Sequence, residues 1–334
     1  MLKKCTILSR NRTLRVWILY GTAMVQCFFY NLKAQQLPLY SQYTFNTFLL
    51  NPATAGAEGY TAINLTNREQ WIGIEDAPRT YALSLQARIM KRNNNTSASV
   101  KKRYRLRSGR VGLGVYIFND HAGQINQTGA QFTYAYHIHL YKSQLSFGAT
   151  FSLLQYMINA NDLKVFDKTD DQINNNKLQV YVPDLNVGVY YADQNKFVGL
   201  SALQLSRSSL NISNYNDKDF RIYRHFYLTG GFKYDLDAQN MLEPSFYIKT
   251  SEELRVQTDV TLKFIHNRKF WFGLGFRTGT TFICSLGMNV GRFYGGYAYD
   301  YCPKGLNNAY GSHELMLALK LGDNVRRYKW IERY

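Results

Sequence analysis

Two kinds of side-chain spacing in the sequence could support metal or phosphate chemistry. His137 and His139 alternate along a strand-like run, so both imidazoles face one side, and neutral imidazole is a common metal ligand. No third ligand accompanies them, so we interpret the pair as polar residues facing an interior. Gly-x-Gly occurs at 112–114 and at 273–275, but neither stretch has the G-x-G-x-x-G spacing or opens a helix. We interpret these glycines as positions where a wall makes room, and we expect no metal and no cofactor.

Nucleophilic and acid–base chemistry has no better support. The sequence contains no G-x-S-x-G elbow of the hydrolase type. Its aspartates and glutamates are scattered, and no pair is fixed by spacing as acid and base. We therefore expect a protein that is not an enzyme.

The cysteines do not predict a disulfide. Cys284 and Cys302 remain if the N-terminal segment, which holds the other two, is removed. If their strands pair through a turn at Gly291-Arg292, Cys284 faces Tyr299, three places from Cys302. At about 3.4 Å per residue this offset is about 10 Å, which is beyond disulfide reach. We expect two free thiols.

The elements around these residues begin with an N-terminal segment typical of export. Residues 1–34 have a basic start, an apolar run from Val16 to Tyr30, and Ala34 before Gln35, which predicts a signal peptide cleaved after Ala34. The alternatives are an uncleaved anchor and a lipoprotein lipidated at Cys27. The run is shorter than the roughly 20 apolar residues needed to span a membrane, and Gln26 stands where a lipoprotein needs a small residue.

The rest of the chain alternates with period two. In the clearest runs, apolar side chains at every second position are separated by small or polar ones, which fits a lipid-facing side and a lumen side. About fourteen strands are predicted at 60–70, 80–89, 110–119, 130–140, 145–153, 183–192, 196–205, 224–235, 241–250, 255–265, 269–278, 280–290, 293–301 and 311–321. A two-sheet sandwich is the alternative, but half of its strands would need a second apolar face.

Composition and loop lengths favour a membrane barrel. Tyr and Phe are abundant (27 and 20) and Pro is scarce (6), as expected for long strands joined by tight turns. No later run is long enough for a membrane helix, and a membrane protein without one must be a closed barrel. With a periplasmic N-terminus, connections after even-numbered strands are tight turns and several odd ones are long, the asymmetry of outer-membrane barrels. The exception is 91–109.

That exception, KRNNNTSASVKKRYRLRSG, concentrates the positive charge. The formal net charge is +17, and residues 1–34 and 91–110 supply most of the excess. Segment 91–109 is either a solvated flexible loop or a docking arm for an acidic periplasmic partner or a phosphorylated lipid. Its candidate binding residues are Lys101, Lys102, Arg103, Arg105 and Arg107. A localised patch in an exported protein argues against nucleic acid.

The segment 35–59 is the part of the mature chain that fits a strand least well. Asn51-Pro52-Ala53 cannot lie inside a sheet, because proline has no N–H to donate and restricts the residue before it. We expect an N-terminal plug or periplasmic segment, followed by a barrel over 60–321 and a short tail over 322–334. The candidate plug or partner-binding residues are Tyr40, Gln42, Tyr43, Phe45, Asn46, Asn51, Pro52 and Ala53.

An ordered set of six motifs runs through the chain: YSQYTFNTFLLNPATAG, NREQWIGIEDAPRTYALSLQA, VGLGVYIFNDHAG, LEPSFYIK, FWFGLGFRTG and GGYAYDYCPKGLNNAYGSHELML. Together they resemble the PorP/SprF family of type IX secretion system membrane proteins. The tail DNVRRYKWIERY departs from the pattern, and the last strand lacks an aromatic pair usual in the family.

The resemblance implies a transmembrane antiparallel β-barrel in the outer membrane of a Gram-negative bacterium of the Bacteroidota type. It implies a role in secretion or gliding motility, without catalysis. Such a protein links the periplasmic machinery to the outer membrane through a peptidoglycan-associated lipoprotein, or exports and anchors a large adhesin with a type IX C-terminal signal. Its partners are these proteins and outer-membrane lipid.

A second resemblance keeps a different function open. The hatch region of FadL-type fatty-acid channels carries a tripeptide similar to Asn51-Pro52-Ala53 after its N-terminal segment. The alternative is therefore a FadL-like channel for hydrophobic solutes, whose plug and lumen would hold a ligand.

Overall fold

The structure is a computed structural model, and it describes residues 38–91, 107–140, 142–158, 178–206, 209–210, 220–252, 256–303 and 309–322. The predicted signal peptide and almost all of the predicted tail lie outside these ranges. Among the described residues, no helix is long and apolar enough to cross a membrane.

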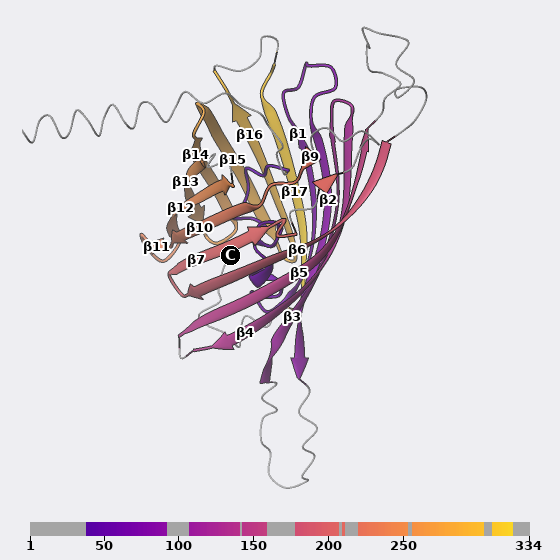
Figure 1. The fold of residues 1–334 in the computed structure, drawn as a ribbon. Helices are drawn as coiled ribbons and strands as arrows, with labels where there is room; N and C mark the ends of the chain where they lie inside the picture. The colour runs from indigo at the N-terminus through magenta and orange to yellow at the C-terminus, as the bar shows by residue number, and fades with distance from the viewer. Residues whose placement is uncertain are drawn as a thin grey trace, which may run out of the picture. The chain divides into compact units, whose positions relative to one another are not determined.

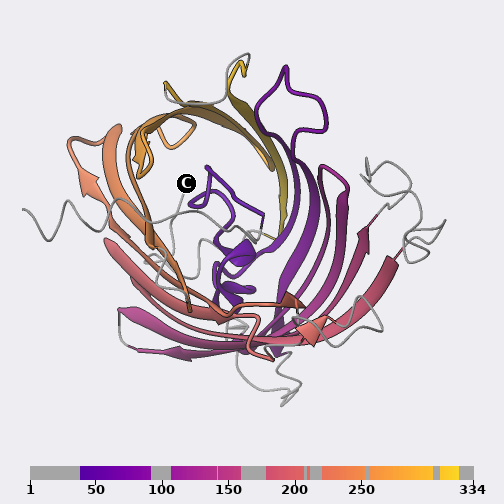
Figure 2. The ribbon, with the colours of Figure 1, turned by 45° about the horizontal axis from the view of Figure 1, so that its top comes forward.

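Fourteen strands of the described chain close into one antiparallel ring (Figures 1 and 2). Each strand pairs with its neighbours in the sequence, β10 pairs with β12, and β1 pairs with β17 to close the barrel. The ring consists of β1 (Thr61–Glu69), β2 (Arg79–Lys91), β3 (Arg107–Ala122), β4 (Ile125–His139), β5 (Ser143–Ile158), β6 (Leu178–Asp193), β7 (Lys196–Leu203), β10 (His225–Phe232), β12 (Asn240–Ser251), β13 (Val256–His266), β14 (Phe270–Arg277), β15 (Thr281–Val290), β16 (Phe293–Tyr301) and β17 (Ser312–Leu321). The prediction of a 14-stranded barrel is confirmed, and closure excludes the sandwich.

Three short strands lie outside this ring. The pair β8 (Ser209–Leu210) and β9 (Phe220–Arg221) forms a separate two-stranded sheet between β7 and β10. β11 (Tyr234–Asp235) extends the edge of β12. The predicted strand 224–235 is therefore divided at Lys233, which belongs to neither β10 nor β11, although its N–H donates to Asn195 O in register with the β10–β7 ladder.

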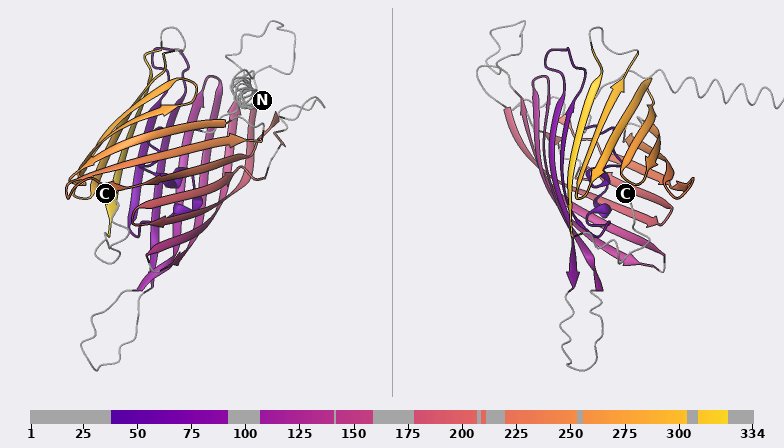
Figure 3. Two further views of the ribbon diagram at one scale, coloured as in Figure 1. Left: turned by 90° about the vertical axis from the view of Figure 1, so that its left-hand side faces the viewer. Right: turned by 180° about the vertical axis from the view of Figure 1, so that it is seen from behind.

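The two faces of the wall differ in the way the alternation predicts. Leu65, Phe132 and Leu200 are each more than half exposed on the outer face, where hydrocarbon replaces water in a membrane. Their neighbours face the lumen, where Thr66 and Thr133 are almost fully buried. The strands run obliquely around the barrel (Figure 3). A lipid-facing outside and a polar inside follow from one local pattern.

The connections define two ends of the barrel. The turn end carries the connections at 140–142, 194–195, 233–239, 267–269 and 291–292, and the loop end carries those at 70–78, 204–224 and 302–311. The connections at 123–124 and 278–280 are also short, so the loop end is uneven. Short turns face the periplasm in such barrels, so we expect the turn end on the periplasmic side.

The register around the cysteines agrees with the sequence prediction. Cys284 pairs with Tyr299, and both Cys284 and Cys302 are free thiols.

Phe118 and Leu154, which depart from the polar lumen pattern, are both buried on the inner face.

Candidate functional site

Residues 38–60 lie inside the barrel, and we call this segment the plug (Figure 2). It contains two short 3₁₀ turns, η1 (Thr47–Leu49) and η2 (Pro52–Thr54), and otherwise irregular backbone. Pro52 starts η2, where its missing N–H costs nothing. The Asn51 side chain accepts a hydrogen bond from Ala53 N at 2.9 Å and so caps this turn.

Asn51 also binds the plug to the wall. Its Nδ2 donates to Val189 O at 3.0 Å and to Leu200 O at 3.2 Å, two residues that face each other in the β6–β7 ladder. A Cβ at Gly188 would overlap Asn51 Oδ1, and one at Gly199 would lie 2.8 Å from Asn51 Nδ2. The wall therefore admits this side chain because glycine stands at both positions.

Other wall glycines accommodate the plug in the same way. A Cβ at Gly112 would overlap Ala55 O, and one at Gly114 would overlap the Phe48 ring. The prediction that Gly112 and Gly114 make room in a wall is confirmed. Gly273 and Gly275 make room for side chains of the wall itself, Ser285 and Thr261 respectively.

A buried carboxylate holds the N-terminal part of the plug. Glu314 accepts hydrogen bonds from Ser41 N at 2.7 Å and from Gln42 N at 2.9 Å. Arg68 Nη1 lies 2.9 Å from Glu314 Oε2 and donates to Ser41 Oγ at 3.0 Å. Glu314 is 0% and Arg68 1% exposed, so both charges depend on these partners.

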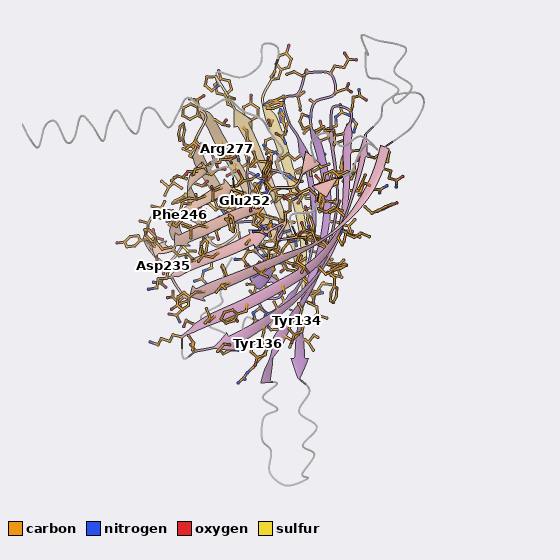
Figure 4. All side chains as sticks on the ribbon, viewed as in Figure 1. Tyr134, Tyr136, Asp235, Phe246, Glu252 and Arg277 are labelled. Atoms are coloured by element: carbon orange, nitrogen blue, oxygen red, sulfur yellow. The ribbon has the colours of Figure 1, made fainter. Side chains whose placement is uncertain are left out.

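A second arginine extends this network. Arg277 donates from Nε to Asp259 Oδ2 at 2.8 Å and from Nη1 to Asp300 Oδ2 at 3.0 Å. It lies on β14, where Figure 4 labels it, and it is buried. Its Nη2 donates to Ser41 Oγ at 2.9 Å, while Ser41 Oγ donates to Asp300 at 2.6 Å. We call Arg68, Asp259, Arg277, Asp300 and Glu314 the ion cluster; it joins five strands to one plug serine.

A third set of polar groups binds the C-terminal part of the plug. His137 donates from Nε2 to Ala55 O at 3.0 Å. Its Nδ1 therefore accepts from the Ser146 hydroxyl at 2.8 Å. Arg88 and Gln144 donate to Ala57 O at 3.1 and 3.4 Å. His137 is thus a structural lumen residue, and the described residues contain no group of three or more His, Cys, Asp or Glu able to hold a metal.

Aromatic residues complete the contact between plug and wall. Tyr40 OH lies 2.6 Å from Tyr116 OH, and Tyr43 stacks on Tyr247 at 5.4 Å between ring centroids. The ring centroids of Phe45 and Trp271 lie 6.4 Å apart. Burial raises the pKa of Tyr43 to about 12 and the pKa of Tyr40 well above its ordinary value, so both phenols are neutral at physiological pH.

The structure gathers most of the candidate plug residues in one place. Buried in the lumen are Tyr40, Gln42, Tyr43, Asn46, Asn51, Pro52 and Ala53; Phe45 is half-buried. Lys101, Lys102, Arg103 and Arg105 lie outside the described residues, and Arg107 begins β3, where its backbone pairs with Lys91.

The sequence prediction missed the ion cluster. Its members are single charged residues at lumen positions of five strands, and only barrel closure brings them together. Arg68 continues the inward-facing series of Asn64 and Thr66, so a charge in phase with a polar face was the available signal.

Comparison with known proteins gives one family and a set of distant structural similarities. A family model described as type IX secretion system membrane protein PorP/SprF matches residues 32–319. No curated protein matches the chain.

Three of the solved structures that are similar to the chain are a channel, a FadL homologue and CdiB. The CymD monoaromatic hydrocarbon channel has 10% identity and a TM-score of 0.48, over 85% of this chain and 92% of that one. A Pseudomonas aeruginosa FadL homologue has 9% identity and a TM-score of 0.41, over 85% and 94%. CdiB from Acinetobacter baumannii has 10% identity and a TM-score of 0.41, over 78% of this chain and 60% of CdiB.

Proposed function

Because the chain belongs to the PorP/SprF family of type IX secretion system membrane proteins, we propose that it is a non-enzymatic outer-membrane component that acts by binding secretion-system partners. The family has no known catalytic activity, and the chain is an outer-membrane barrel. Among the partners that the family implies, we propose a peptidoglycan-associated lipoprotein, bound on the periplasmic side, that links the periplasmic machinery to this barrel.

The plug, which is bonded to the wall inside the lumen, is the observation that carries this proposal. The plug is hydrogen-bonded to opposite walls, through Ser41 to β16 and β17 and through Asn51 to β6 and β7. Two cavities beside it measure about 10 and about 20 Å³, each about enough for a single water molecule. Such a lumen supports binding at the barrel ends rather than passage of solutes.

The distribution of charge supports a partner at the periplasmic side. At the turn end the described charged residues are mainly basic, and at the loop end they are mainly acidic. The basic set at the turn end comprises Arg88, Arg110, Lys142, Lys196, Lys233, Arg268, Lys269, Arg292 and Lys320. The two strands that flank the proposed docking arm at 91–109 reach this same end, β2 at Lys91 and β3 at Arg107. An acidic partner surface is complementary to it, and such charges steer association.

Co-purification of the full chain in mild detergent tests the proposal. We expect a periplasmic lipoprotein to be recovered at low salt and lost at high salt. A variant lacking residues 40–56 should lose the partner while its barrel still folds, as judged by the heat-dependent shift of its band in gel electrophoresis.

Other outcomes would contradict the proposal. If the barrel is isolated alone and deletion of the gene leaves secretion unchanged, the protein does not act by binding secretion-system partners. Recovery of a secreted adhesin instead of the lipoprotein would move the function to export and anchoring. A fatty acid in the purified lumen, with an uptake defect on deletion, would favour the FadL-like channel.

A further inference from the structure

A small cavity opens at the turn end, between the plug and the strands β13 to β17. It measures about 20 Å³, and we call it the mouth pocket. It is lined by Thr44, Phe45, Glu58, Lys263, Ile265, Arg268, Lys269, Trp271, Asn289, Tyr294 and Lys320. Four of these residues are cationic, and Glu58 is the single carboxylate among them.

Lys320 is held at the wall of this pocket by aromatic rings. Its Nζ lies 4.1 Å from the centroid of the Tyr294 ring and 4.8 Å from that of Tyr60. Its side chain is 12% exposed and lies 3.7 Å from Glu58 Oε2, whereas the Glu58 side chain is 29% exposed. Cation–π contacts fix the ammonium group in place, so the partly exposed carboxylate is the more mobile partner of this ion pair.

The opposite side of the pocket is also preorganised. Lys263 Nζ donates to Thr44 Oγ1 at 2.6 Å and lies 4.8 Å from the centroid of the Trp271 ring. Trp271 in turn lies against Gly287 and Gly296, because a Cβ at either position would meet its ring within about 3.0 Å. Lys263 also lies 3.9 Å from Glu243 Oε1, a buried carboxylate of the wall. Lys320, with aromatic rings beside it, is therefore the cation that the pocket offers to a small anion.

We propose that the mouth pocket binds a carboxylate from an acidic peptide segment of the periplasmic partner, and that Glu58 occupies the site until the partner replaces it. This inference rests on the proposed function. Glu58 is itself a carboxylate held at Lys320 beside the cavity, so its displacement leaves room for one carboxylate of the partner. Lys263 and Lys320 lie at lumen positions of β13 and β17, so a lipid headgroup outside the wall cannot reach these two cations.

The test measures binding of two labelled peptides, hexaglutamate and hexaglutamine, to the full chain in detergent micelles by fluorescence anisotropy. We expect hexaglutamate alone to bind, more weakly as salt rises. Lys320→Gln should weaken binding about tenfold, and Glu58→Gln should strengthen it about tenfold because the internal competitor is neutral. The opposite directions separate a binding effect from misfolding.

Two matched controls make the same changes of charge at the same end of the barrel. Lys196→Gln and Asp235→Asn alter exposed residues outside the pocket, and each should change affinity less than about twofold, the size of a screened surface effect. Binding by Lys320→Gln equal to that of the unmodified chain, or no gain with Glu58→Gln beyond that of Asp235→Asn, would overturn the inference.

The same variants separate this inference from the proposed function. If the unmodified chain recovers the lipoprotein and Lys320→Gln recovers it equally well, the pocket is not the recognition site but the function stands. If neither recovers it while hexaglutamate binding still follows the pocket variants, the proposed function fails and the site remains.

Discussion

Replacing Asn51 with alanine should release the centre of the plug without unfolding the barrel. The side chain makes three hydrogen bonds, to Val189 O, Leu200 O and Ala53 N. At about 1 kcal/mol net for each neutral bond, the loss is about 3 kcal/mol. Because 1.4 kcal/mol corresponds to a factor of ten, opening of the plug should become about a hundredfold more frequent. The wall keeps its own ladders, so the opening stays local.

Hydrogen exchange followed by mass spectrometry measures this opening in the purified barrel. Amides of 46–57 should lose about a hundredfold of their protection in Asn51→Ala, while those of β12 to β14 stay unchanged. The matched control is Asn64→Ala, a wall asparagine that donates to Ser84 Oγ at 3.2 Å; it should change plug protection less than about fivefold. Unchanged protection of 46–57 in Asn51→Ala, or equal loss in the strands, would refute the reasoning.

Three further perturbations address the wall, the ion cluster and the buried phenols. Gly112→Ala should lower the free energy of opening the plug by about 1–3 kcal/mol, because the new Cβ overlaps the Ala55 carbonyl. Protease should then cleave the plug faster. Gly295→Ala is the control, because the nearest contact of its Cβ is at 3.7 Å. Arg68→Met removes a cationic partner from two buried carboxylates, so the free energy of unfolding should fall by about 3–5 kcal/mol. The temperature at which the barrel unfolds in a gel-shift assay should fall with it. Burial raises the pKa of Tyr43 from about 10 to about 12. The contribution of this residue to the stability of the packed plug is therefore fully present below pH 10. Up to about 3 kcal/mol of that stability should be lost as the pH rises to 12. Tyr43→Phe should remove that part of the alkaline sensitivity in the same exchange experiment.

Each of these perturbations has an outcome that contradicts it. Equal protease sensitivity of Gly112→Ala and Gly295→Ala would mean that the plug does not press on the wall. An unchanged unfolding temperature in Arg68→Met would mean that the ion cluster adds nothing to stability. Alkaline release that is as steep in Tyr43→Phe as in the unmodified chain would assign the sensitivity to other groups.

The barrel could be predicted from the sequence because its signals are local. Alternation with period two defines each strand and its two faces, as the match between the predicted strand at 293–301 and β16 illustrates. Turn residues such as Gly291, with its positive φ, fix the register of neighbours, which is why Cys284 was expected opposite Tyr299. Local signals did not show that the strand predicted at 224–235 is divided into β10 and β11 at Lys233.

By itself, the sequence determined that the chain forms a closed barrel with a segment around Asn51-Pro52-Ala53 that cannot join the wall. Only the tertiary structure decided where that segment lies and what holds it. Ser41 meets Glu314 across 273 positions of sequence, and Asn51 meets Leu200 across 149. Such pairings depend on how the strands tilt and close around the lumen. A period-two pattern records which face a residue takes, but not which residue lies across the interior from it.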